Sequence, residues 1–269
     1  MPPFPSLLSH PAILSSNISH YLSPSSTLSD CPTLLNLLDK HEVKNVHTTI
    51  GIHPYSAPPT RPTNLLDTIR KQLKDDRVVC VGECGLDYSE GFPAKDLQLP
   101  IFVDQVQIAV ETSTPLFIHT RLAHEDTLRI LDSQKELPPV VIHCFTGTVS
   151  ELDDFLSRGF YIGFTGFICK PSNKEILEAS SRVPIDKIMI ETDAPYMGFK
   201  NCRESYLEAE GSLENLSTKE KKKLLSKTYP NVPSALPRVC EVLAQARSMP
   251  VENFARHTTD NAKRFFGFE

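Results

Sequence analysis

The sequence lacks several features that would assign it to a familiar class at once. Its 269 residues contain no apolar run approaching the roughly 20 residues that a membrane-spanning helix needs. No Lys or Arg precedes Lys40, which disfavours a secretory signal or a mitochondrial presequence, because both are basic near their start. No glycine-rich phosphate loop follows a predicted strand, which argues against a dinucleotide-binding or P-loop protein. We therefore expect a cytoplasmic protein, with nuclear access as the alternative.

Paired cysteines and excess positive charge are also missing. The seven cysteines are an odd number and form no CxxC pair, so they are predicted to be reduced thiols rather than a disulfide framework. The net charge of −5 argues against a histone-like binder of nucleic acid. It leaves a nuclease open, because metal ions in a cleft can hold the few phosphates being cut. No membrane or protein partner is indicated.

What the chain does contain is a regular alternation of apolar stretches and helix-like segments. Buried parallel strands have this continuous apolar character, and right-handed crossovers join them into a barrel or an open doubly wound sheet. A barrel of about 250 residues would fill the chain. The six predicted strands are Val46–His53, Val78–Gly82, Leu116–His119, Val140–His143, Phe160–Phe164 and Lys187–Glu191. The predicted helices cover 32–42, 62–75, 97–112, 123–133, 149–158, 173–181, 213–227 and 233–267.

The front of the chain does not fit this alternation. Residues 1–31 are rich in Ser, Pro and Leu and have no clear periodicity, so we predict an atypical leader that is disordered or poorly packed. Residues 32–269 would then form a TIM-type α/β barrel that lacks its usual first one or two strands. Either the leader supplies a substitute strand, or a partner covers the gap, or the chain is only marginally stable.

Four metal-seeking side chains stand near the ends of separate predicted strands: Glu83, His119, His143 and Asp193. The carboxyl ends of the strands in an α/β barrel meet at one mouth, where such enzymes keep their chemistry. Mixed imidazole and carboxylate ligation is typical of hydrolytic metal sites. Each residue alone has a plainer reading: a rim salt bridge for Glu83, a hydrogen-bonded core histidine, or a turn-capping Asp193. The four in succession favour a metal centre.

Two further residues are weaker candidates for contacts with a substrate. His53 ends a predicted strand and could contact a phosphate, although a buried structural role is nearly as good an interpretation. Arg121 lies two residues beyond His119, points the same way along its strand and could form a fork to phosphate. Its plainer reading is a salt bridge at the rim. Glu191 shares a strand face near Asp193 and is predicted to support the site from behind.

The phrases around these residues resemble a known family. GECGLD at 82–87, PLFIHTR at 115–121, VIHCFTG at 141–147 and ETDAPY at 191–196 are similar, in this order, to the TatD-type metal-dependent deoxyribonucleases of the amidohydrolase superfamily. The phrases YIGFTG and TTDNAKRFFG add to the resemblance, which runs from about residue 46 to the C-terminus.

The resemblance implies a TIM barrel that binds one or two divalent metal ions (Mg, Mn or Zn) and hydrolyses phosphodiester bonds in DNA, typically from the 3′ end. It implies that Glu83, His119, His143 and Asp193 bind metal, that Asp193 and Glu83 are catalytic, and that His53 and Arg121 contact the substrate. In this mechanism Asp193 orients the attacking water or takes its proton.

The chain departs from the family pattern in two places. An Asp-led phrase normally lies on the family's first strand, and nothing in residues 1–45 matches it. An Arg-Asn-Glu-Pro phrase is replaced by Pro230-Asn231-Val232-Pro233. Three alternatives stay open. A small-molecule amidohydrolase or a deacylase would use the same metal site, and the missing first strand leaves open a catalytically impaired isoform that acts through protein contacts.

Overall fold

The computed structural model describes residues 10–16 and 18–268, which divide into two compact units. The first unit comprises residues 20–143, 150–161 and 262–268. The second comprises residues 10–16, 18–19, 144–149 and 162–261. Strands and helices alternate along the described chain, as the apolar pattern predicts.

Five parallel strands form the sheet of the first unit. In chain order they are β1 (Tyr21–Ser23), β2 (Val46–Ile50), β3 (Val78–Asp87), β4 (Leu116–Arg121) and β5 (Val140–Ile142). Each strand pairs with the next one along the chain. Because all five run the same way, their carboxyl ends lie along one edge of this sheet.

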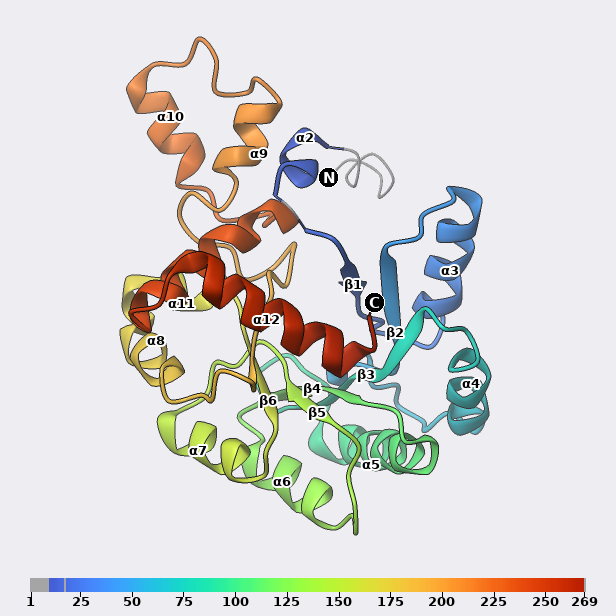
Figure 1. Cartoon of the computed structure of the whole chain (residues 1–269). Coiled ribbons are helices and arrows are strands. Elements are labelled where there is room, and N and C mark those ends of the chain that lie inside the picture. Colours follow the sequence, from blue (N-terminus) through green and yellow to red (C-terminus); the bar gives the residue numbers. More distant parts are fainter. Residues whose placement is uncertain (1–9, 17, 269) are drawn as a thin grey trace. The chain divides into compact units, whose positions relative to one another are not determined.

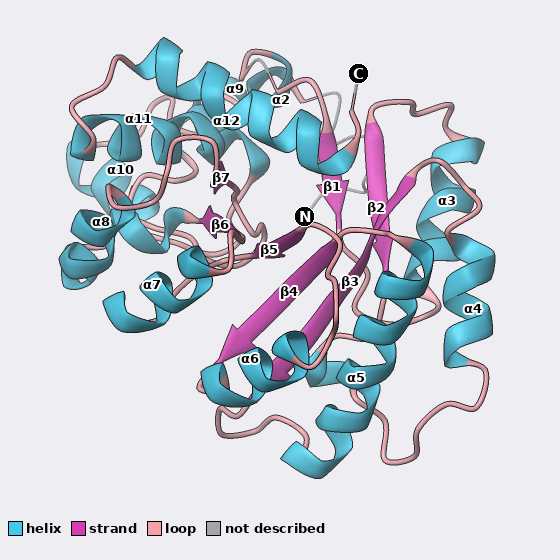
Figure 2. Cartoon of the chain, turned by 60° about the horizontal axis from the view of Figure 1, so that its bottom comes forward, coloured by secondary structure: helices cyan, strands magenta, loops and turns pink. Residues whose placement is uncertain are grey.

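Helices cover the outer face of these strands (Figures 1 and 2). They are α3 (Asp30–Lys40), α4 (Leu65–Gln72), α5 (Lys95–Thr112) and α6 (His124–Asp132), and most of α7 (Val149–Ser157) belongs to the same unit. Helix α3 packs on β2, α5 on β3 and α6 on β4. The core between them contains fully buried side chains such as Ile50, Leu86, Phe102 and Ile118. Strands buried on both faces explain why the sequence shows apolar runs rather than alternation.

The leader supplies a strand, which was one of the three alternatives left open for the front of the chain. Residues 21–23 form β1 and pair in parallel with the start of β2, with Tyr21 opposite Val46. Beyond β1, Ser25 is buried and forms two hydrogen bonds with β2. Its amide donates to Thr49 Oγ1 at 3.0 Å, and its hydroxyl donates to the Thr49 carbonyl at 2.7 Å. The expectation of a disordered leader is therefore corrected for residues 20–31, and residues 1–9 and 17 lie outside the described part of the chain.

Gly85 allows β3 and β4 to approach each other closely. It has φ of +139°, and a Cβ at this position would lie 1.8 Å from the carbonyl oxygen of His119. Only glycine has both the backbone freedom and the missing side chain that this contact requires. Gly85 therefore makes room for the neighbouring strand, which carries His119.

The second unit contains a short parallel pair, β6 (Tyr161–Phe164) and β7 (Ile188–Ile190), with Ile162 opposite Ile188. Its helices are α2 (Pro11–Leu14), α8 (Lys174–Ser180), α9 (Glu204–Ala209), α10 (Thr218–Leu225), α11 (Leu236–Ala246) and most of α12 (Val251–Phe266). Helix α11 packs against α8 and β7. The side-chain amide of Asn261 on α12 donates to the carbonyls of Ile185 and Ile188, each at 2.8 Å, and so ties this helix to β7.

The observed elements match the six predicted strands and most predicted helices, with boundaries that differ by a few residues. The largest difference is β3, which continues to Asp87 and therefore includes Glu83 rather than ending before it. In the predicted helical segment 213–227 the helix begins only at Thr218. No helix among the described residues is both long and apolar enough to cross a membrane. None of the seven cysteines, all of which are described, forms a disulfide.

Candidate metal centre

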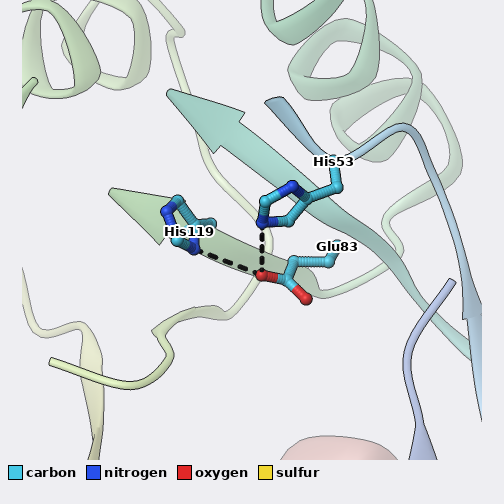
Figure 3. A group of neighbouring side chains, drawn as sticks. All are labelled: His53, Glu83 and His119. Atoms are coloured by element: carbon cyan, nitrogen blue, oxygen red, sulfur yellow. Dashed lines mark ion pairs between the residues drawn. The ribbon is translucent and has the colours of Figure 1, made fainter. Parts of the chain in front are cut away.

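Three imidazole rings converge on one carboxylate oxygen in the first unit. Glu83 Oε1 lies 2.7 Å from Nε2 of His143, 3.1 Å from Nε2 of His53 and 3.2 Å from Nδ1 of His119. Figure 3 shows the rings of His53 and His119 pointing at this oxygen, His53 from above and His119 from the left in this view. All four side chains are largely buried, with exposed fractions between 4% and 19%. Imidazole nitrogens gathered around a carboxylate oxygen are the kind of donor set that a divalent cation binds.

The sheet places each of these side chains at the same edge. His53 follows β2, Glu83 lies in the second half of β3, His119 lies on β4, and His143 directly follows β5. The amide of His143 donates to the carbonyl of Ile118 at 3.0 Å, which continues the β4–β5 pairing up to the site. Four successive strands thus each deliver one polar side chain where their carboxyl ends meet, as in α/β barrel enzymes.

A buried carboxylate fixes the orientation of His119. Asp87 is 1% exposed, and its Oδ2 lies 2.8 Å from His119 Nε2. The backbone amide of Ser89 also donates to this carboxylate, at 2.8 Å. In neutral His119 the proton therefore lies on Nε2, toward Asp87, and the lone pair of Nδ1 faces Glu83. A carboxylate behind an imidazole is the usual support of a metal-binding histidine.

His53 has the opposite orientation. Its Nδ1 accepts a hydrogen bond from the backbone amide of Tyr55 at 3.0 Å, at the start of the short helix η1 (Pro54–Ser56). A nitrogen that accepts cannot carry the proton, so in neutral His53 the proton lies on Nε2 and points at Glu83. His53 thus faces the centre as a hydrogen-bond donor, whereas His119 faces it with a lone pair.

The charges in this cluster depend on one another. Burial alone would raise the pKa of Glu83, but the charge of His143 and hydrogen bonds from the three imidazoles outweigh it, so its pKa lies well below the usual range. Burial would lower the pKa of His119, yet its bonds to Asp87 and Glu83 prevail and raise it above 6.5. Asp87 behaves like Glu83: burial raises its pKa, hydrogen bonds from His119 and Ser89 lower it, and the net shift is downward.

These observations fit a divalent cation. When His119 is neutral, its Nδ1 lone pair lies 3.2 Å from an anionic oxygen, an arrangement that is favourable only if a positive charge lies between them. Either a second proton on the imidazole or a metal ion can supply that charge. His53, Glu83 and His119 bring one ligand atom each within 4.8 Å of one another and so could hold such an ion. His143 lies beside this group, with its Nε2 2.7 Å from Glu83 Oε1.

Of the remaining predicted residues, Arg121 is in the first unit and Asp193 is in the second. Arg121 ends β4 opposite Asp87 of β3, and its side chain is exposed. A contact between Arg121 and substrate stays a prediction. Asp193 follows β7 and has φ of +51°. Asp193 and Glu83 belong to different units, and convergence of their carboxylates stays a prediction.

The loop that carries Asp193 is held by a buried asparagine. Asn231 is fully buried, donates from its backbone to the Pro195 carbonyl at 2.8 Å and from its side chain to the Thr192 carbonyl at 2.9 Å. The altered Pro-Asn-Val-Pro phrase therefore has a structural function, because Asn231 forms hydrogen bonds with the loop before and after Asp193. The nearby Glu191 accepts a hydrogen bond from the backbone amide of Cys144 at 2.5 Å, and its support of the site stays a prediction.

Asp87 is the functional residue that sequence reasoning missed. It belongs to the GECGLD phrase, and its separation from Glu83 by an even number of residues on one strand was the available signal. We expect Asp87→Asn to lower metal affinity at pH 8 by about 10- to 100-fold, because the neutral amide no longer fixes His119. Isothermal titration with Mn²⁺ or Zn²⁺ measures this, and the exposed Asp76→Asn variant is the control.

The same substitution should change the pH dependence of metal binding. Protonated His119 cannot bind a cation, so affinity falls as pH falls through its raised pKa, and the loss begins above pH 6.5. Without the Asp87 charge the pKa of His119 decreases, so the pH at which metal affinity is lost should move to a lower value. If that pH is the same in Asp87→Asn and the wild type, the role assigned to Asp87 is contradicted.

Comparisons with known proteins agree with the fold. The profile of the TatD related DNase family matches residues 11–267, and so includes most of the leader. A 3′-5′ ssDNA/RNA exonuclease TatD from Escherichia fergusonii is 33% identical over 222 residues, which cover 82% of this chain and 77% of the relative. The protein of the same name from Salmonella typhimurium is 39% identical over 152 residues, 56% of this chain and 58% of the relative.

Solved structures show the same architecture. The TatD homologue YJJV from Escherichia coli superposes with a TM-score of 0.78 at 23% identity, over 99% of this chain and 94% of that one. A hydrolase TatD family protein from Entamoeba histolytica gives 0.75 at 24% identity, over 98% and 89%. The prediction of a TIM-type α/β fold is confirmed.

The fold and the cluster of imidazoles and carboxylates define an α/β metal-dependent hydrolase. More narrowly, the chain belongs to the TatD related DNase family.

Proposed function

We propose that this protein is a divalent-metal-dependent deoxyribonuclease that removes nucleotides from the 3′ end of single-stranded DNA. The observation that carries the proposal is the convergence of three imidazoles on Glu83 at the carboxyl ends of four successive strands. Family membership and relatives named as 3′-5′ exonucleases on ssDNA and RNA supply the substrate class. Water attacks the phosphorus of the last phosphodiester, and the bond between that phosphorus and the 3′ oxygen of the penultimate nucleotide breaks. This oxygen takes up a proton, and the terminal nucleotide leaves with the phosphate.

Glu83, His119 and His143 would hold the ion. Two imidazole ligands favour Zn²⁺ or Mn²⁺ over Mg²⁺, which prefers oxygen. Such an ion supplies Lewis-acid stabilisation of the phosphoryl oxygens and lowers the pKa of water. A second ion would need Asp193 together with Glu83, so the proposal requires one ion and allows two.

The chain's own residues would do the rest. His53, whose Nε2 carries the proton, donates to a nonbridging phosphate oxygen, and this supports its assignment as a substrate contact. Arg121 offers a guanidinium fork to the next phosphate. Asp193 takes the proton from the attacking water. A cytoplasmic location is part of the same proposal.

The test is a cleavage assay with a 5′-labelled single strand. Purified protein with Mn²⁺, Zn²⁺ or Mg²⁺ should give a ladder that shortens from the 3′ end with time. EDTA should abolish the ladder, and added metal should restore it. Two results would overturn the proposal: release of the 5′ label as a mononucleotide, or hydrolysis of carboxylic ester and amide substrates without any cleavage of DNA.

A further inference from the structure

Two aromatic side chains lie next to the metal centre without a part in holding it. Tyr55 is on η1 and its side chain is 66% exposed. Phe92 lies in the loop between β3 and α5, and its ring centroid is 5.5 Å from that of Tyr55, at an interplanar angle of 76°. We call Tyr55 and Phe92 the aromatic pair. Phe92 is the one ring that Tyr55 contacts in the described part of the chain, so much of the tyrosine ring is open to solvent.

The aromatic pair is connected directly to the candidate centre. The backbone amide of Tyr55 donates to Nδ1 of His53, and the ring centroids of Phe92 and His53 are 6.3 Å apart. The His53 ring in turn lies 4.7 Å from the His119 ring. A phosphate that accepts from His53 Nε2 would therefore carry its nucleoside close to Tyr55 and Phe92.

An open aromatic face beside a phosphate site matches the chemistry of an unpaired nucleobase. Bases stack on tyrosine and phenylalanine regardless of their identity, because every base has a π face. The base at a frayed or single-stranded end is free to stack, whereas a paired base is already stacked in its duplex. The exposed Arg121 at the end of β4 supplies positive charge for the backbone of such a strand.

We infer that the aromatic pair binds the 3′-terminal nucleobase of a single strand and so makes the enzyme selective for unpaired ends without selecting the base. This inference rests on the proposed function and assigns the substrate-recognising element of that same site. Tyr55 and Phe92 bind and position the end, and the groups around Glu83 carry the reaction.

The experiment compares two 5′-labelled oligonucleotides that differ only in the 3′-terminal residue, a normal nucleotide or an abasic analogue. For the wild-type protein, kcat/KM for removal of the terminal residue should be about 10-fold or more lower on the abasic end, as expected for loss of one stacked base. Tyr55→Ala should lose a similar factor on the normal end, mostly through KM, and should leave the abasic end unchanged. Tyr55→Phe keeps the ring and should restore the preference.

Tyr229→Ala is the matched control, since Tyr229 is 64% exposed and lies in the second unit. Equal cleavage of both ends by the wild type would overturn the inference while leaving the proposed function in place. So would equal losses on both ends in Tyr55→Ala, which would indicate a merely structural tyrosine. Tyr196 is an exposed tyrosine three residues after Asp193. If Tyr196→Ala, rather than Tyr55→Ala, removes the preference for the normal end over the abasic end, the base does not bind to the aromatic pair. Absence of cleavage of either strand by the wild type would reject the proposed function itself, and the inference with it.

Discussion

Replacing Glu83 by glutamine should abolish metal-dependent release of nucleotides. The substitution keeps the size of the side chain and removes the charge on which three imidazoles converge. Without that charge, the cation loses its anionic ligand, and the histidines are left facing a neutral amide. We expect kcat to fall by more than the roughly 10²–10³-fold that loss of a single electrostatic contact costs an active site. The assay is release of the 3′ nucleotide at saturating Mn²⁺ or Zn²⁺.

The control for this variant must separate lost chemistry from lost folding. Glu136→Gln changes the same functional group at an exposed position and should retain wild-type activity. Circular dichroism in EDTA should show that Glu83→Gln remains folded, because Val81, Leu86 and the other apolar residues of β3 keep their packing. Metal should raise the unfolding temperature of the wild type but not of Glu83→Gln, since an ion stabilises only a protein that binds it. Full activity in Glu83→Gln would exclude the proposed centre.

Part of this centre could be predicted because parallel strands impose a simple rule. A polar side chain at the end of a buried apolar run lies at the carboxyl edge of the sheet, and the pattern around Glu83, His119 and His143 follows that rule. The three residues meet in the structure: one ring nitrogen of His143 and one of His119 lie within hydrogen-bonding distance of Glu83 Oε1. The repeated strand–helix alternation predicted the fold class for the same reason.

Other parts could not be predicted because they depend on contacts that leave no local pattern. Strand β1 is three residues long and gains its order from pairing with β2 and from the bonds between Ser25 and Thr49. Its Ser-rich sequence has no β-strand periodicity, so composition suggested disorder. Three-dimensional pairing overrode local propensity, as it does in many edge strands.

The proton positions on the histidines are a second example. The sequence predicted His119 as a metal ligand and His53 as a weaker candidate for a substrate contact, but it could not say which ring nitrogen of either residue carries the proton. The turn places the Tyr55 amide on Nδ1 of His53, and the strand register places Asp87 on Nε2 of His119. These two contacts decide that His53 faces Glu83 with a proton and that neutral His119 faces it with a lone pair. A division of roles between two equal side chains thus arises from their backbone surroundings.

Asp193→Asn tests whether the second unit contributes to the same reaction. If Asp193 takes the proton from the attacking water, the substitution should lower kcat by roughly 10²–10³-fold, while the affinity for the first metal ion stays within about 10-fold of wild type. Asp186→Asn, at an exposed position in the same unit, should leave both quantities unchanged. Loss of metal binding in Asp193→Asn would instead assign this carboxylate to the ion.

The double variant Glu83→Gln/Asp193→Asn decides whether the two carboxylates act together. Residues that act as one catalytic unit give strongly non-additive losses, because the first substitution already removes the step that the second one serves. We therefore expect the double variant to be no slower than Glu83→Gln alone, as measured by single-turnover release of the 3′ nucleotide. If the two losses multiply, Asp193 acts on a separate step. Asn231→Ala should then help to identify that step, because Asn231 holds both sides of the Asp193 loop through Thr192 and Pro195.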